Sequence, residues 1–261
     1  MNNAIITTGR KNQSESINLA KMMAAKLNIP FVERRNFSIN ALLTNYNVKQ
    51  VLIAKQNTLR LYTADDEIFF HPNMSHLRIK NILSGSGDRM AEAMNLKCGM
   101  KVLDCTLGLG ADAIVASFIA GESGSVTAIE INPCLAAVVN YGLKYFDGER
   151  KHIIEAMRRI KVINADYSAF LKSTPDNSFD VVYFDPMFRH PLTNSNNLNP
   201  LRHVADHRAV TIEAVEHACR VAKSRVVLKE NARSLEFARL GFDTIYGGKY
   251  SPIKYGVIIV N

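Results

Sequence analysis

The sequence predicts an α/β protein, in which a mostly parallel sheet ends in an antiparallel C-terminal pair and follows a small N-terminal α+β unit. From residue 102 onwards, short apolar runs alternate with helical patterns, which is typical of parallel strands joined by crossover helices. Near the end of the chain, two strand patterns are separated only by a short glycine-containing loop, as in an antiparallel pair. With 261 residues and a hydrophobic content of 47%, the chain can bury the core of such a fold.

The N-terminal part mixes strand and helix patterns. Its strand patterns cover residues 4–8, 31–34, 51–54, 59–62 and 68–71, and its helical patterns cover residues 16–27 and 39–46. Apolar residues at helical spacing, among them Ala20, Met23 and Leu27, indicate the first helix. Because Pro72 ends the last strand pattern, we expect a small domain over residues 1–72 and a polar connector over residues 73–88.

The larger domain is expected over residues 89–261. Its strand patterns cover residues 102–104, 125–131, 161–164, 181–185, 225–229, 242–246 and 255–260. Its helical patterns cover residues 89–96, 111–120, 133–145, 167–171, 209–222 and 235–240. Since helices separate the first five strands, we expect those strands to be parallel to one another.

The net charge of +8 is unevenly distributed along the chain. Residues 1–89 hold 12 basic and 6 acidic side chains, a net of +6, which leaves +2 for the rest. This fits an N-terminal portion that contacts a polyanion such as RNA, although ordinary solubility charge explains it equally well.

Composition also argues against several classes of protein. No apolar run is long enough to span a bilayer, and the N-terminus lacks a signal-peptide pattern, so a cytoplasmic location is expected. The four cysteines include no CxxC pair, and His203 and His207 have no evident third ligand, so no metal site is expected.

The segment from Val102 to Gly110 indicates a pocket for a nucleotide-type cofactor. Asp104 ends the first strand of the larger domain, and Gly108 and Gly110 let the backbone approach a ligand closely. Acidic residues also end or follow the next two strands. The residues expected to bind the cofactor are Asp104, Thr106, Gly108, Gly110, Asp112, Glu130, Ile131, Asp166 and Tyr167.

Two cofactors compete for this pocket. The pattern Gly108-x-Gly110-x-x-Ala113, with Glu130 twenty residues after Gly110, satisfies the dinucleotide fingerprint and keeps an NAD-dependent oxidoreductase as an alternative. However, Asp104 lies where a cationic amino group fits better than a pyrophosphate, and no second substrate domain follows. These features favour S-adenosylmethionine, with S-adenosylhomocysteine as the product.

A second motif, Asp185-Pro186-Met187-Phe188, follows the fourth strand and is expected to face the same crevice. The Asp185 carboxylate and the Pro186 carbonyl can accept the two hydrogens of an exocyclic base amine, which aims the nitrogen lone pair at a methyl group. Phe188 can stack on the base, a contact that contributes about 1–3 kcal/mol. We therefore predict Asp185, Pro186 and Phe188 as catalytic residues of a methyl transfer to nucleic acid.

The two motifs resemble those of a known family. Residues 85–261 look like a Rossmann-like class I S-adenosylmethionine-dependent methyltransferase. Within that class, the stretch from Leu103 to Ala113, the tetrapeptide from Asp185 to Phe188 and the strand from Val226 to Lys229 resemble the bacterial small-subunit rRNA guanine-N2 methyltransferases (the RsmJ-like family). The resemblance implies rRNA methylation at a guanine, with small-subunit rRNA as the partner.

Substrate contacts and two further functions remain open at this point. Arg78, Lys80, Arg189 and Lys229 are candidate substrate-binding residues. The same fourth-strand motif also serves adenine N6, so an adenine-N6 nucleic-acid methyltransferase is an alternative. A non-catalytic RNA-binding protein with a degenerate cofactor fold is another.

Overall fold

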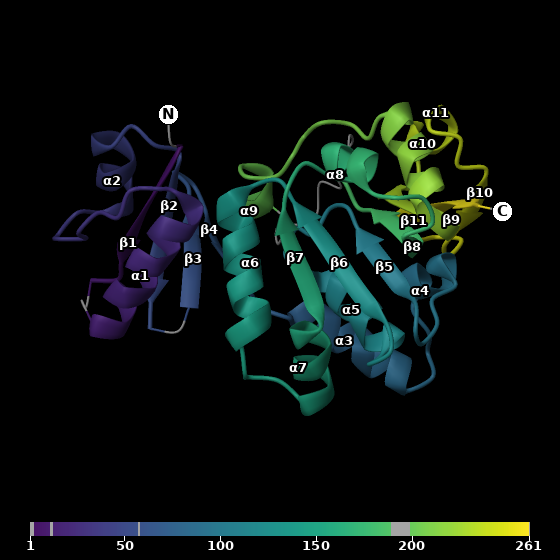
Figure 1. Ribbon diagram of the computed structural model, residues 1–261, viewed down its shortest axis with the longest axis horizontal. Helices are drawn as coiled ribbons and strands as arrows, with labels where there is room; N and C mark the ends of the chain where they lie inside the picture. The colour runs from purple at the N-terminus through teal and green to yellow at the C-terminus, as the bar shows by residue number, and fades with distance from the viewer. Residues whose placement is uncertain (1–2, 11–12, 57, 189–198, 261) are drawn as a thin grey trace.

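The computed structural model describes residues 3–10, 13–56, 58–188 and 199–260, and Figure 1 shows two sheets side by side. The strand order is β1-β2-β3-β4 in the smaller sheet and β10-β11-β9-β8-β5-β6-β7 in the larger one. Within the described residues, no helix is long and apolar enough to cross a membrane.

The smaller sheet is formed by the N-terminal part of the chain. Its elements are β1 (Ala4–Thr8), α1 (Ser14–Leu27), α2 (Ile39–Asn45), β2 (Gln50–Lys55), β3 (Thr58–Tyr62) and β4 (Glu67–Phe69). The strand expected over residues 31–34 is reduced to a single bridge between Phe31 and Ile6. It stops there because a turn follows, in which Phe37 donates to the Arg34 carbonyl and Arg35 has a φ of 42°.

A helix forms where the sequence predicts a polar connector. α3 (Asn73–Leu83) begins directly after Pro72, and its residues Ser75 and Ile79, one turn apart, are both fully buried. The Ser75 hydroxyl donates to the carbonyl of Ala111, the first residue of the helix over residues 111–120, at 3.2 Å, which fixes α3 against that helix. The connector is therefore part of the packed structure, while the division of the chain at residues 72 and 89 stays a prediction.

The larger sheet is the middle one of three layers, because helices pack on both of its faces. Its strands are β5 (Lys101–Asp104), β6 (Ser125–Glu130), β7 (Ile160–Asn164), β8 (Phe179–Phe184), β9 (Ala222–Asn231), β10 (Thr244–Tyr246) and β11 (Ile253–Ile259). One face packs against α3, α4 (Arg89–Met94), α5 (Ala111–Ala120), α6 (Pro133–Tyr145) and α7 (Lys151–Arg158). The other packs against α8 (Tyr167–Ser173), α10 (Ile212–Val221) and α11 (Glu236–Arg239), and α9 (Asn199–Arg202) lies near β4.

The direction of the strands confirms the predicted fold class. β5 to β9 are parallel wherever they pair, and β11 runs antiparallel to both β9 and β10. β11 therefore lies inside the sheet, between β9 and β10, rather than at its edge. Dinucleotide-binding folds of the doubly wound type have six parallel strands in the order 3-2-1-4-5-6, so this inserted strand sets the chain apart from them.

Helix α6 joins the two sheets into one packed body. It lies between β3 and β7 in Figure 1, and it contacts both strands. A Cβ atom added to Gly142 of α6 would lie 2.2 Å from Cγ of Phe70, so the absence of a side chain lets Phe70 reach the helix. A single cluster of buried apolar side chains consequently runs from the small sheet into the large one.

Candidate active site

Acidic residues from three adjacent strands meet at one edge of the large sheet. Asp104 ends β5, Glu130 ends β6, and Asp185 directly follows β8. Because β5 pairs with both β6 and β8 in parallel, the carboxyl ends of all three strands lie side by side. This is the topological switch point of the sheet, where ligands bind in open α/β folds.

The glycine-rich loop and the fourth-strand motif are in direct contact. The Asp185 backbone N–H donates to Thr106 Oγ1 at 2.6 Å, and the Cys105 N–H donates to the Tyr183 carbonyl at 2.9 Å. Thr106 is itself turned by a bond from its N–H to Asp104 Oδ1 at 3.0 Å. The two motifs are therefore adjacent at the carboxyl ends of β5 and β8.

The glycines give the loop a shape that other residues adopt with strain. Gly108 and Gly110 have φ angles of 51° and 80°, in the left-handed region. A Cβ on Gly110 would also come within 3.3 Å of Val139 Cγ1. The loop leads into α5, and the Gly108 N–H points to Glu130 Oε2 at 3.3 Å, so the turn brings backbone donors towards the strand ends.

Two of the acids at this edge are buried with few partners. Asp104 is 2% exposed, and burial raises the pKa of its carboxyl to about 8. Glu130 is 7% exposed, and burial raises its pKa to about 7 in spite of hydrogen bonds from the N–H groups of Asn132 and Gly108. Carboxyls in such surroundings favour a ligand that brings positive charge and hydroxyl donors to them.

A third acid lies at the start of α8 and is already paired. Asp166 caps the helix by accepting from the Ser168 N–H at 2.8 Å, and it also binds Arg208 at 2.8 Å. Although burial raises the pKa of Asp166, the hydrogen bond from Arg208 lowers it below its usual value. The ring of the adjacent Tyr167 packs edge-on against Phe184, with 5.6 Å between the ring centroids.

A segment that was not predicted to bind the cofactor lies next to Asp166 and Glu130. Asp206 pairs with Arg208 at 2.7 Å, and the side chain of Asn132 donates to the Val204 carbonyl at 3.0 Å. This segment, residues 204–208, therefore lies beside the carboxyl ends of β6 and β7. The sequence holds no local signal for the contact between Asn132 and Val204, because these residues lie 72 positions apart.

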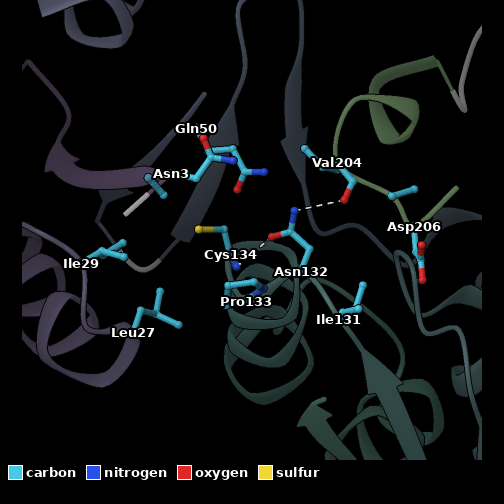
Figure 2. A pocket seen from close by; sticks show the side chains of 12 residues that line it. Asn3, Leu27, Ile29, Gln50, Ile131, Asn132, Pro133, Cys134, Val204 and Asp206 are labelled. Carbon is cyan, nitrogen blue, oxygen red and sulfur yellow. Dashed lines mark hydrogen bonds between the residues drawn. The ribbon is translucent and has the colours of Figure 1, made fainter. Parts of the chain in front are cut away.

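A cavity of about 400 Å³ lies between the small sheet and the start of α6. Figure 2 shows Leu27 and Ile29 on one side of it and Val204 and Asp206 on the other. Of the residues predicted to bind the cofactor, Ile131 lines the cavity, and Asp185 is not part of its lining. Its lining comprises Asn3, Ala4, Leu27, Ile29, Gln50, Ile131, Asn132, Pro133, Cys134, Val204, Ala205 and Asp206.

Asp185 is held by a buried lysine. Lys229 Nζ, on β9, lies 2.7 Å from Asp185 Oδ2 and 3.0 Å from Asp112 Oδ2. Burial raises the pKa of Asp185, Lys229 lowers it and Asp112 raises it, and the result is a value of about 6. Asp112 was expected to contact the cofactor, but in the structure its carboxylate is bonded to Lys229, Arg78 and the Tyr183 hydroxyl.

The residues predicted to bind substrate are placed differently from one another. Arg78 is bound to Asp88 through two nitrogens, at 2.7 and 2.9 Å, as well as to Asp112. Lys229 is bonded to Asp185 and Asp112. In this structure the charged groups of Arg78 and Lys229 are therefore both paired with carboxylates and do not bind a phosphate. Lys80 is exposed on α3, and Arg189 lies outside the described residues.

The fold of the chain is that of a Rossmann-like methyltransferase. The large sheet places acids at successive strand ends around a glycine turn, and its seventh strand is antiparallel. A structure from Neisseria gonorrhoeae described as a SAM-dependent methyltransferase has the same fold, with a TM-score of 0.66 over 98% of this chain and 96% of that one, at 19% identity.

The sequence assigns the chain to a family within that class. Residues 35–245 match the family model described as "Putative SAM-dependent methyltransferase", and the chain belongs to this family. It is 38% identical to the uncharacterized protein YpiP of Bacillus subtilis, over 97% of this chain and 98% of that protein. It is 30% identical to the ribosomal RNA small subunit methyltransferase J of Dechloromonas aromatica, over 62% of this chain and 65% of that protein.

The cofactor of this family is S-adenosylmethionine, and the strand-end residues fit it. The chain is a methyltransferase, so the alternatives of a nicotinamide enzyme and of a non-catalytic protein are not supported. Asp104 and Glu130 have raised pKa values because they are buried with few partners. An α-ammonium group and ribose hydroxyls are the kinds of group that such carboxyls would bind.

Proposed function

We propose that this enzyme methylates the N2 amine of a guanine in small-subunit rRNA. The observation that carries the proposal is the 2.6 Å contact between the Asp185 N–H and Thr106 Oγ1, which brings the amine-binding motif to the cofactor loop. The similarity to proteins named ribosomal RNA small subunit methyltransferase J supports the choice of RNA. The basic excess in residues 1–89 supports a polyanionic partner.

The cofactor residues are assigned in this proposal by their place around the strand ends. Gly108 and Gly110 leave the backbone open to the ligand, and Asp104 faces its ammonium group. Glu130 accepts hydrogen bonds from the ribose hydroxyls, while Ile131 and Tyr167 contact the adenine. Asp166 recognises the adenine edge after Arg208 has moved aside or turned towards solvent.

The transfer step depends on how the acceptor nitrogen is held. An exocyclic amine on guanine is a poor nucleophile because its lone pair is conjugated with the ring. In the proposal, Asp185 and the Pro186 carbonyl each accept one amine hydrogen, so the lone pair turns out of the ring plane, and Phe188 stacks on the base. When bound, S-adenosylmethionine would supply the methyl group from its sulfonium and leave as S-adenosylhomocysteine, and the proton that the amine loses would pass to the Asp185 carboxylate. Positioning of the two groups lowers the barrier by about 7–11 kcal/mol.

Adenine N6 is the second candidate acceptor, because it presents the same kind of amine to the same motif. Mass spectrometry of nucleosides from small-subunit rRNA, purified from cells with and without the gene, separates the two. We expect loss of N2-methylguanosine in cells that lack the gene, and its return when the gene is restored. Loss of N6-methyladenosine instead would overturn the guanine assignment.

A further inference from the structure

We propose that Lys229 is a positioning residue for Asp185, and that Asp112 and Arg78 hold Lys229 in place. Lys229 then fixes the direction and the charge of the carboxylate that receives the amine, rather than touching substrate. This inference rests on the role proposed for Asp185, and the experiment below distinguishes a failure of one from a failure of the other.

The Asp185 carboxylate is fixed from two sides. Its own backbone N–H is bonded to Thr106, and its Oδ2 accepts from Lys229 Nζ at 2.7 Å. The carboxylate therefore keeps only Oδ1 and the second lone pair of Oδ2 for a substrate amine. A side chain that is anchored in this way presents an acceptor in one direction, as a group that receives a planar amine must do.

Lys229 cannot reach a substrate phosphate while it makes these contacts. Its side chain is 17% exposed, and its ammonium lies between the carboxylates of Asp185 and Asp112. Burial lowers the pKa of Lys229, but the two carboxylates raise it by more, so the net shift is upward and the ammonium stays charged. Leaving these two carboxylates would leave their charges without a cation in a largely buried place, which is costly, so the contacts to Asp185 and Asp112 are retained.

Asp112 makes the most contacts in the cluster that consists of Asp185, Lys229, Asp112, Tyr183 and Arg78. Its Oδ2 accepts from Lys229 at 3.0 Å and from the Tyr183 hydroxyl at 2.7 Å, and its Oδ1 accepts from Arg78. Burial raises the pKa of Asp112, but Lys229 and Arg78 lower it far more, so this carboxyl is ionised. With its charge shared between two cations, Asp112 does not draw Lys229 away from Asp185.

Arg78 extends the cluster to helix α3, outside the large sheet. Two of its nitrogens donate to Asp88, the residue that caps α4, and a third donates to Asp112. Because a guanidinium has donors in a fixed plane, this arrangement locks the distance between α3, α4 and α5. The helix between the two units thereby contributes to the geometry of Asp185 without contacting the substrate.

The pH dependence of methyl transfer tests the inference. The charged and titratable groups around Asp185 are Lys229 on β9, Asp112 on α5, Asp104 on β5, Tyr183 on β8, Tyr255 on β11 and Arg78 on α3. The rate should fall on the acid side as Asp185 takes up a proton, near pH 6 in the unaltered enzyme. Removing the Lys229 charge raises the pKa of Asp185 further. The acid limb of the pH–rate profile, where the rate falls as Asp185 is protonated, therefore moves to higher pH.

We therefore compare transfer of labelled methyl groups to small-subunit rRNA, from about pH 5 to about pH 9, in four variants. In Lys229→Met the acid limb is expected to move up by at least about one pH unit, with about a tenfold lower rate at neutral pH. Lys229→Arg keeps the charge and should leave the limb near its original place. Lys223→Met, on the same strand but paired with Asp180 at 3.6 Å, should change neither limb nor rate.

Asp185→Asn is the fourth variant, and it separates the two claims. If Asp185→Asn transfers methyl groups normally, the proposed role of Asp185 fails. If Asp185→Asn is inactive while Lys229→Met loses the same fraction of its rate at every pH, then Lys229 is merely structural and only this inference is overturned. Calorimetry with S-adenosylhomocysteine must show unchanged cofactor binding in each variant, which establishes that the variants are folded.

Discussion

At the scale of single residues, burial disfavours the ionised forms of the Asp104 and Glu130 carboxyls. Both carboxyls end a buried strand, and burial raises the pKa of each, to about 8 and about 7 respectively. In the unfolded chain both would titrate near their ordinary values, which are close to 4. Between those limits the folded protein binds more protons than the unfolded chain, so its free energy of unfolding falls as the pH rises.

Asp104→Asn should remove the part of the pH dependence of the unfolding free energy that comes from Asp104. From about pH 4 to about pH 8, we expect the free energy of unfolding of the variant to fall less steeply than that of the unaltered protein. At pH 8 the variant should be more stable by at least about 1 kcal/mol, because one unit of pKa shift is worth about 1.4 kcal/mol. Urea unfolding at several pH values measures this, and parallel profiles for the two proteins would contradict it.

The sequence could locate these acids but not all of their partners. An apolar run that ends in an acid marks the carboxyl end of a buried strand, which is why Asp104, Glu130 and Asp185 were found. Asp112 stays a predicted cofactor contact, and in the structure its carboxylate is bonded to Arg78 and Lys229. Its partners Arg78 and Lys229 lie 34 and 117 residues away, and no local pattern connects them.

At the scale of elements, helix α6 carries the contact between the two sheets. It packs against β3 of the small sheet and against β7 of the large one, and Gly142 faces Phe70 at the point of closest approach. A glycine in the middle of a helix normally costs about 0.5–1 kcal/mol relative to alanine. Its presence here is explained by the space that Phe70 requires.

Gly142→Ala should therefore destabilise the protein in spite of the higher helix propensity of alanine. We expect a loss of about 1–3 kcal/mol, because the new methyl group would overlap the Phe70 ring and neither backbone can move freely. In a Phe70→Ala background the same substitution should be neutral or stabilising, which chemical denaturation of all four proteins measures. Equal destabilisation in both backgrounds would show that the ring is not the cause.

The element boundaries show which sequence signals are strong. The strands β5 to β9 were all predicted, because buried parallel strands are nearly continuous apolar runs, whereas the helices α7 and α9 between them were not. α3 was predicted as a connector, and in the structure only Ser75 and Ile79 of its residues are buried, whereas its apolar residues Met74, Leu77 and Leu83 are exposed. The strand expected at residues 31–34 is reduced to a bridge because a local turn follows it, in which Phe37 donates to the Arg34 carbonyl and Arg35 adopts a positive φ.

At the scale of the whole molecule, the sheet order brings together residues that are distant in the sequence. Placing β5 between β6 and β8 puts Thr106 next to Asp185, 79 residues further on. The fold class was predictable from element order alone, but the insertion of β11 between β9 and β10 was not, since the sequence indicates only an antiparallel pair. That insertion places Tyr255 opposite Lys229, beside the cluster that holds Asp185.

The central claim is that Asp185 acts on the acceptor amine and not on the cofactor. Asp185→Asn, measured for methyl transfer to small-subunit rRNA and for S-adenosylhomocysteine affinity on the same preparation, tests it most directly. We expect the rate of methyl transfer to fall at least about 100-fold, while the dissociation constant of S-adenosylhomocysteine changes by less than about threefold. Retained transfer, or a loss of cofactor affinity as large as the loss of transfer, would contradict it.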